Sequence, residues 1–250
     1  MRSVRAVRAV RAVRAQTAAE VRLTLRRGDS VLLALGIPVG LLLFFSLVRV
    51  LPLPAGTRHP VDFLAPGVLS LAVMSTAMVS LGIATGFERQ YGVLKRLGAT
   101  PLGRPALLTA KTAAMLCVEV LQVVVLVAVA LALGWRPSGD PGLAVVGGLL
   151  ASVAFAGVGL AMAGSLRAEV TLAAANGLYL LLILLGGMIF PLSKLPGALG
   201  TLARGLPASA LSDVLHGTLS AAAVPGRAWI VLAVWAVAAP LLAAVTFRWE

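Results

Sequence analysis

The chain has 250 residues, of which 60% are hydrophobic and 12% are charged, and its formal net charge is +12. A soluble domain of this size could not bury so much apolar surface, so the composition indicates a membrane protein. The single cysteine excludes an internal disulfide, and basic charge without a nucleic-acid-reading motif argues against nucleic-acid binding. Anionic lipid headgroups are the better partner for these charges.

The N-terminal segment is basic and repetitive. Val-Arg-Ala occurs four times between Val4 and Ala15, and a period of three spreads valine and arginine around a helix. We therefore expect residues 1–15 to be a low-complexity tail, and the alternative is a basic helix on the inner headgroup layer. Residues 16–29 have a better amphipathic pattern and predict such an interfacial helix. A membrane domain over residues 30–250 is expected to follow.

Six apolar runs follow, each close to the ~20 residues that a helix needs to cross a bilayer. They are Val31–Val48, Leu64–Gly86, Leu107–Leu133, Leu143–Ser165, Leu172–Phe190 and Trp229–Phe247. Backbone polar groups in lipid must be satisfied internally, so spanning helices are expected. The tail, the loop between the second and third runs, Arg167 and Arg248 hold 15 of the 21 Lys and Arg residues. The positive-inside rule therefore places both termini in the cytoplasm.

A charged segment separates the second run from the third. Residues 87–98 read Phe-Glu-Arg-Gln-Tyr-Gly-Val-Leu-Lys-Arg-Leu-Gly, and Thr100-Pro101 follows. This pattern predicts a helix of about three turns that ends at Gly98. We expect a rigid rod along the inner membrane face that could transmit a push from a soluble partner. The alternative is an ordinary interfacial loop helix held by its arginines.

Three polar residues lie inside predicted spans. Glu119 and Gln122 are one turn apart in the third run, and Asn176 is near the start of the fifth. A carboxylate at this depth costs at least ~2.5 kcal/mol, so it usually faces the bundle interior and has a partner. We expect Glu119 to be either a substrate or proton contact on a transport path, or a protonated packing residue. Small residues at four-residue spacing predict close helix packing: Gly36 and Gly40, Gly82 and Gly86, Gly159 and Ala163.

Two blocks of this sequence resemble the permeases of the ABC-2 type transporter family. Glu88–Leu97 followed by Ala99-Thr100-Pro101-Leu102 is similar to their cytoplasmic segment, which commonly reads Glu-Arg-Glu-x-Gly-Thr-Leu-(Lys/Arg)-x-Leu-x-x-Thr-Pro. Gly186-Gly187-Met188-Ile189-Phe190-Pro191, with Pro196 and Pro207 after it, is similar to the block that closes their fifth span. The resemblance covers roughly residues 20–250.

The resemblance implies an all-α membrane protein with six transmembrane helices and the ABC-2, type V exporter-like permease fold. It implies an N-terminal interfacial helix within residues 1–29, a cytoplasmic coupling helix at about 87–98 and an extracellular re-entrant segment at about 191–226. Two such subunits, identical or paralogous, would form the pathway of an exporter in a bacterial plasma membrane. Its cargo would be drug-like or lipid-like, as in drug or antibiotic resistance.

The resemblance also implies a separate ABC ATPase subunit that binds ATP and magnesium. This chain has no Gly-x-x-x-x-Gly-Lys-[Ser/Thr] loop, so it is expected to bind no cofactor and no metal and to have no catalytic residue. Carried over by position, the residues that would face the ATPase are Glu88, Arg89, Tyr91, Gly92, Lys95 and Arg96. The carried-over re-entrant motif is Gly186, Gly187, Phe190, Pro191, Pro196 and Pro207. Gln90 departs from the family, which usually has a second acidic residue there.

Two other classes are weaker alternatives. A secondary transporter is expected to show inverted repeats, but no second copy of the charged segment occurs in the later spans. An intramembrane serine protease needs an embedded serine and a histidine on another span. Here both histidines, His59 and His216, are predicted to lie in exposed loops.

Overall fold

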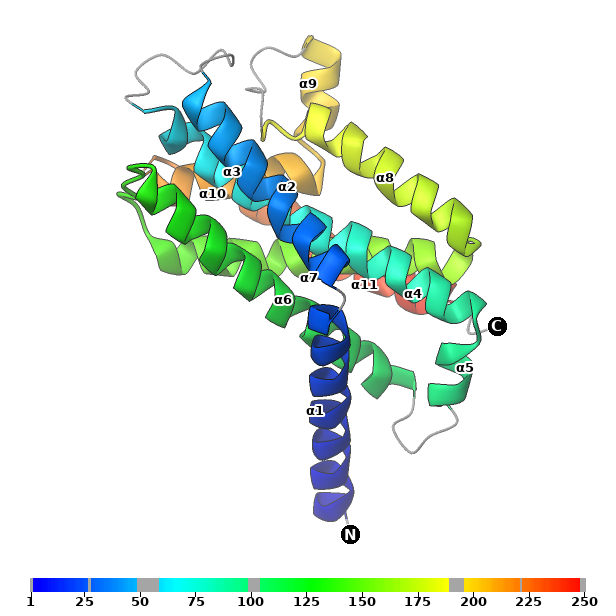
Figure 1. Cartoon of the computed structure of the whole chain (residues 1–250). Coiled ribbons are helices and arrows are strands. Elements are labelled where there is room, and N and C mark those ends of the chain that lie inside the picture. The colour runs from blue at the N-terminus through cyan, green and yellow to red at the C-terminus, as the bar shows by residue number, and fades with distance from the viewer. Residues whose placement is uncertain are drawn as a thin grey trace.

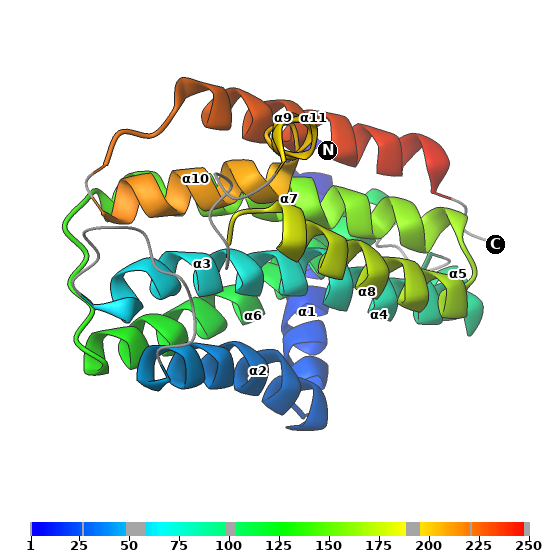
Figure 2. The same ribbon diagram turned by 90° about the horizontal axis from the view of Figure 1, so that it is seen from above.

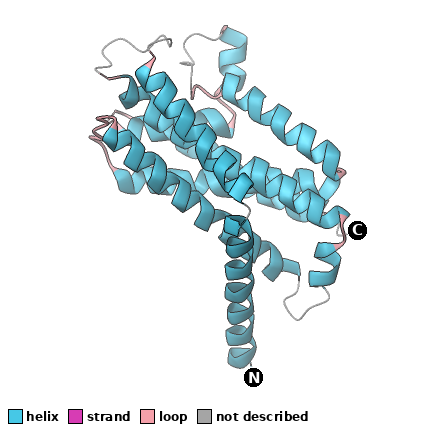
Figure 3. Ribbon diagram, in the orientation of Figure 1, coloured by secondary structure: helices cyan, strands magenta, loops and turns pink. Residues whose placement is uncertain are grey.

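The computed structural model describes residues 2–26, 28–48, 59–98, 104–188, 196–220 and 222–247, and within these ranges it has helices and loops but no strand (Figure 3). The helices are α1 (Arg2–Arg26), α2 (Gly28–Leu47), α3 (Pro60–Met74), η1 (Ser75–Ser80), α4 (Leu81–Gln90), α5 (Val93–Gly98), α6 (Arg104–Ala132), α7 (Pro141–Ser165), α8 (Ala168–Leu185), α9 (Gly197–Ala203), α10 (Pro207–Leu219) and α11 (Gly226–Thr246). The predicted all-α class is confirmed.

Five helical stretches are long and apolar enough to cross a membrane: Pro60–Gln90, Ala106–Ala132, Pro141–Ser165, Ala168–Leu185 and Gly226–Thr246. They coincide with the second to sixth predicted runs. The first of them joins α3, the π-helical η1 and α4 into one helix of 31 residues. In α2, the apolar part whose side chains are described, Ala34–Leu47, is shorter than a span. The structure therefore supports a multi-pass membrane protein, and the count of six spans stays a prediction.

The helix α7 lies at the centre of the bundle. It packs against α11, α4, η1 and α10. Figure 2 shows α2 and α11 on opposite outer sides, with α3 and α7 between them. Alanine and glycine make up much of α7, so its smooth surface lets several helices approach its axis. In Figure 1, α8 runs along the outside of the bundle, where much of its surface is exposed.

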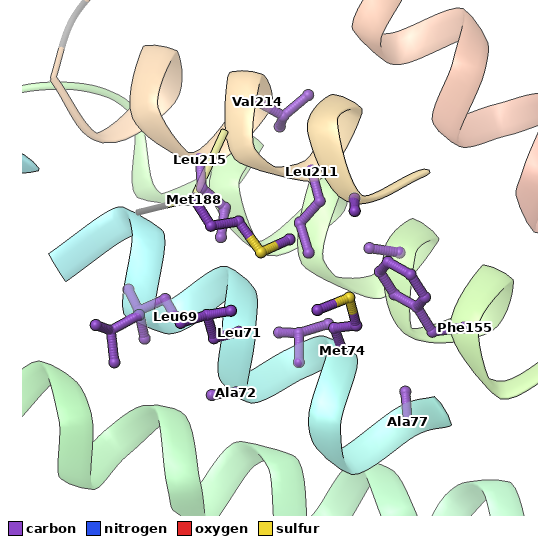
Figure 4. Packing of buried hydrophobic residues seen from close by; sticks show 14 of the residues in the cluster. Leu69, Leu71, Ala72, Met74, Ala77, Phe155, Met188, Leu211, Val214 and Leu215 are labelled. Carbon is purple, nitrogen blue, oxygen red and sulfur yellow. The ribbon is translucent and has the colours of Figure 1, made fainter. Parts of the chain in front are cut away.

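The main core forms where α3, α7 and α10 meet. Met74, Phe155 and Leu211, one from each helix, are fully buried, and Met188 packs between α3 and α10 (Figure 4). Methionine side chains are flexible and fill irregular gaps between helices. This packing buries α10 within the bundle, so part of the predicted re-entrant segment, residues 191–226, is a buried helix.

Glycines bring η1 and α4 into backbone contact with α7. A Cβ added to Gly82 would lie 3.0 Å from the carbonyl oxygen of Gly159. A Cβ added to Gly159 would lie 2.5 Å from the carbonyl oxygen of Met78. The close approach predicted for these two helices is confirmed. The described residues place nothing within 4 Å of a Cβ added to Gly36 or Gly40 of α2.

The helix α1 projects from the bundle, with the N-terminus at its far end (Figure 1). It is continuous from Arg2 to Arg26, so the Val-Arg-Ala repeats are helical. Its C-terminal half packs on the start of α6, where the Thr17 hydroxyl donates to the Ala110 carbonyl at 3.4 Å. Leu23 and Leu25 are exposed on this helix beside arginines, a pattern typical of helices that lie in a headgroup layer.

The glycine contact predicts a large difference between two Gly→Ala substitutions. Gly159→Ala is expected to destabilise the protein by about 1–3 kcal/mol, because the new methyl group meets backbone that cannot rotate away. Gly40→Ala is the matched control and is expected to be neutral or slightly stabilising, since alanine favours helix by about 0.5–1 kcal/mol. Thermal unfolding in lipid nanodiscs measures both, and equal melting temperatures would contradict the close contact.

Candidate functional site at the charged end of the bundle

Charged side chains gather where α4 ends, α6 begins and α7 turns into α8. The C-terminal part of α1, the short α5 and the end of α11 also lie at this end (Figure 1). We call it the charged end and define it by Glu20, residues 88–96, Lys111 and residues 164–169. It includes the predicted cytoplasmic segment, so the structure brings that segment together with α1, α6, α7 and α8.

The continuous coupling helix expected over residues 87–98 is interrupted. Phe87–Gln90 completes α4, a turn follows at Tyr91 and Gly92, and α5 begins at Val93. Gly92 has a φ of +69°, a left-handed conformation that side-chain-bearing residues rarely adopt. Its N–H donates to the Arg89 carbonyl at 3.0 Å, which closes the end of α4. The segment is therefore the end of a spanning helix joined by a glycine turn to a six-residue helix.

Lys111 of α6 binds two carboxylates from two other helices. Its Nζ lies 3.0 Å from Oε1 of Glu20 on α1, and it also pairs with Oε2 of Glu88 on α4. Only 4% of the lysine side chain is exposed, and an ammonium group so far from water needs paired carboxylates to offset its desolvation. Glu88, which was expected to face a partner protein, thus lies toward α6. The missed partner, Glu20, could have been noticed as the only acidic residue in α1.

Arg89 caps the C-terminal end of α7. Its guanidinium donates to the Gly164 carbonyl at 2.5 Å and to the Leu166 carbonyl. The last carbonyls of a helix have no partner within the helix and carry the negative end of its dipole. A guanidinium group donates hydrogen bonds to these carbonyls and places a positive charge beside the negative end of the dipole. Arg89 therefore fastens α4 to the turn between α7 and α8.

Gln90 binds the first turn of α8. Its amide nitrogen donates to Oε1 of Glu169 at 2.8 Å, and its amide oxygen accepts the Ala168 N–H at 3.2 Å. A glutamate at position 90 could not donate to Glu169 and would place a second negative charge beside it. Glutamine replaces the usual acidic residue of the family at position 90, and it can therefore donate a hydrogen bond to Glu169 at the start of α8.

The remaining predicted contact residues of this segment face outward. Tyr91 is 67% exposed, and its ring stacks on Phe87 with centroids 6.1 Å apart. Lys95 and Arg96 of α5 are also exposed, and Gly92 is half-buried in the turn. The charged end thus offers an aromatic ring and two basic groups to solution, while Glu88 and Arg89 bind within the chain.

The polar residues of the predicted spans have different surroundings. Gln122 is fully buried and joins three elements, since its amide donates to the Ala34 carbonyl and accepts from the Thr76 hydroxyl, both at 2.6 Å. Glu119 is buried beside Ser152 of α7. Asn176 is exposed on α8, where its amide donates to the Leu172 carbonyl of its own helix at 2.8 Å, its one hydrogen bond among the described residues. The structure therefore groups Glu119 and Gln122 inside the bundle and leaves Asn176 on its surface.

The second family-like block ends α8 and begins the next helices. Gly186 caps α8, and Gly187 has a φ of +70° that turns the chain. Phe190 and Pro191 lie outside the described residues. Pro196 precedes α9, and Pro207 is the first residue of α10, a position where the missing N–H of proline costs nothing.

His216 does not lie in an exposed loop, as the sequence predicted, whereas His59 does lie at an exposed helix start. His216 is on α10, with Nε2 3.0 Å from the Phe63 carbonyl and Nδ1 3.2 Å from the Ser212 hydroxyl. Burial lowers the pKa of His216. Ser212 is only 3% exposed, so a substrate cannot reach its hydroxyl in this arrangement. The His216 imidazole therefore holds α10 against α3.

The buried ion pairs predict that Lys111→Met destabilises the protein. The substitution preserves the aliphatic stem but removes the Lys111 ammonium that Glu20 and Glu88 share, at an expected cost of about 3 kcal/mol. Thermal unfolding in nanodiscs is the measurement. The triple variant Lys111→Met/Glu20→Gln/Glu88→Gln removes the charges together and should recover part of the loss. A Lys111→Met protein as stable as the wild type would refute the pairing.

The comparisons with known proteins identify the family of this chain. A family model described as ABC-2 type transporter matches residues 11–219, from α1 to the end of α10. No curated protein matches the chain. The family match covers the charged end, four of the five candidate spans and α10, and it confirms the resemblance carried by the two sequence blocks. The chain belongs to the ABC-2 type transporter family.

Proposed function

We propose that this chain is the transmembrane permease subunit of an ATP-driven ABC exporter and that the charged end binds a separate ATPase subunit. One observation carries the proposal. Tyr91, Lys95 and Arg96 project into solution from the turn and short helix that connect two candidate spans. Tyrosine and arginine are enriched in protein interfaces, so this exposed segment is suited to docking a soluble partner.

The bonds behind this surface explain how a push on it would reach the membrane. The turn at Tyr91 continues directly into a helix of 31 residues. Glu88 ties the same point to α6 and α1 through Lys111, Arg89 ties it to α7, and Gln90 ties it to α8. A displacement of the turn would therefore act on several spans at once. In this proposal ATP and magnesium bind to the ATPase subunit, and this chain binds no cofactor.

A second permease subunit, identical or paralogous, would complete the pathway. The helix α8 exposes leucines together with the Asn176 amide. An amide facing lipid in a span is unfavourable, so a second copy or the cargo would supply its missing partner. We place Asn176 on the substrate path at that seam, with Glu119 and Gln122 as further candidates inside each subunit. The cargo would be drug-like or lipid-like, exported across a bacterial plasma membrane.

The orientation follows from the same charges. The charged end and both termini would lie in the cytoplasm, with the exposed arginines of α1 on anionic lipids of the inner leaflet. These arginines are Arg11, Arg14, Arg22 and Arg26. In this orientation α10 and the turn at Gly186 and Gly187 lie at the extracellular end.

Charge reversal tests the ATPase contact. The complex, purified from its native cells into nanodiscs, is expected to hydrolyse magnesium-ATP. Arg96→Glu should lower that activity at least about tenfold, because like charges across an interface cost several kcal/mol. Arg136→Glu, on an exposed arginine at the other end of α6, is the matched control and should leave it unchanged.

Two results would overturn the proposal. A wild-type preparation without magnesium-ATP hydrolysis would indicate a carrier that works without an ATPase. A cysteine placed at Tyr91 in the Cys117→Ser background should react with membrane-impermeant reagents only from the cytoplasmic side. Reaction from the outside would put the charged end beyond the reach of any ATPase.

A further inference from the structure

A buried carboxyl group in the membrane-spanning part has no cation beside it in the described part of the chain. Glu119 lies midway along α6 and is 6% exposed. None of the ion pairs among the described residues includes it. Its Oε2 is buried and has no hydrogen-bond partner in the described part of the chain. An ionised carboxylate in such a place is far more costly than a neutral acid.

The hydroxyl beside Glu119 indicates where the proton is. Ser152 Oγ lies within hydrogen-bonding distance of both Oε1 of Glu119 and the Gly148 carbonyl, the latter at 2.8 Å. A serine hydroxyl has one proton, and a carbonyl oxygen can only accept. Both contacts are satisfied when Ser152 donates to Gly148 and the Glu119 acid donates to Ser152.

The neighbouring elements supply no compensating charge. The described helix α7 contains no ionisable residue, and neither does η1 nor the part of α2 over Ala34–Leu47. The nearest cation along α6 is Lys111, eight residues away or about 12 Å along the helix axis, and it is already paired with Glu20 of α1 and Glu88 of α4.

The other packed elements place their charges at the ends of the bundle. Asp62 is in the first turn of α3, at the end opposite the charged end. Arg89 of α4 binds the α7 carbonyls. Lys95 and Arg96 of α5 are exposed. Glu119 therefore lies in an uncharged layer with Gln122, Thr76 and Ser152.

We propose that Glu119 is a proton-binding site inside the membrane. In the arrangement seen here it is a carboxylic acid bonded to Ser152, and it releases its proton to water when α6 and α7 separate. The O–H bond of the acid breaks, the proton goes to water and a carboxylate remains. When the contact with Ser152 forms again, the carboxylate takes up a proton from water and the acid is restored. The release and return of the proton rest on the proposed transport function. The protonated resting state of Glu119 does not depend on that function.

Infrared spectroscopy of the protein in nanodiscs tests the protonated state directly. The wild type at neutral pH should show the carbonyl band of a protonated carboxylic acid, shifted slightly in D2O. Glu119→Gln should lose that band and remain folded, because an amide N–H can replace the acid in donating to Ser152. Glu20→Gln is the matched control and should keep the band, since Glu20 pairs with Lys111 and the Ser152 hydroxyl binds Glu119. A band that is absent from the wild type, or unchanged in Glu119→Gln, would refute the proton site.

Exchange of the acid proton tests the link to transport. In the complex with its ATPase, conversion of the band to its D2O position should be at least tenfold faster during magnesium-ATP turnover than at rest. Equal exchange rates would overturn the link while leaving the resting acid in place. Failure of the proposed function has a different signature, since the complex would then show no magnesium-ATP hydrolysis and the resting band would still be present.

Discussion

The ammonium group of Lys111 is the constraint on which the charged end depends. It is almost completely removed from water, so it can remain charged only with carboxylates beside it. Those carboxylates come from Glu20 and Glu88, which fixes α1 and α4 against the start of α6. The ion pairs thereby add to the packing of α1 on α6. The exposed segment at Tyr91 is consequently attached to α4, which these ion pairs join to α1 and α6.

The polar backbone at the end of α7 gives the same segment a second attachment. Arg89 satisfies carbonyls that the helix cannot satisfy itself, and Gln90 bonds both the N–H and the side chain that begin α8. Arg89 and Gln90 are successive residues, and their side chains bind different elements, the end of α7 and the start of α8. In the proposed mechanism the consequence is mechanical, because one short segment is connected to α1, α6, α7 and α8 and to its own spanning helix.

The polar groups within the spans are satisfied in three different ways. Gln122 has partners on both sides of its amide and so serves as a structural joint. Oε1 of Glu119 contacts Ser152, and Oε2 has no hydrogen-bond partner among the described residues. This arrangement fits the proposed change of protonation. Asn176 faces outward with only its own helix as partner, which fits a surface completed by another molecule. Hydropathy alone treats all three as similar interruptions of an apolar run.

The sequence by itself determined the membrane class, the approximate positions of five candidate spans and the family. These follow from local properties, since apolar runs of sufficient length, breaks at glycine and proline, and short motifs are all read along the chain. It also located the charged segment and its exposed residues Tyr91, Lys95 and Arg96. Only the tertiary structure decided that Glu88 and Arg89 bind within the chain, that Gly92 divides the charged segment and that α10 is buried. Glu20 and Lys111 are 91 residues apart, and a pair so distant in the chain is set by how helices pack, which no local pattern encodes.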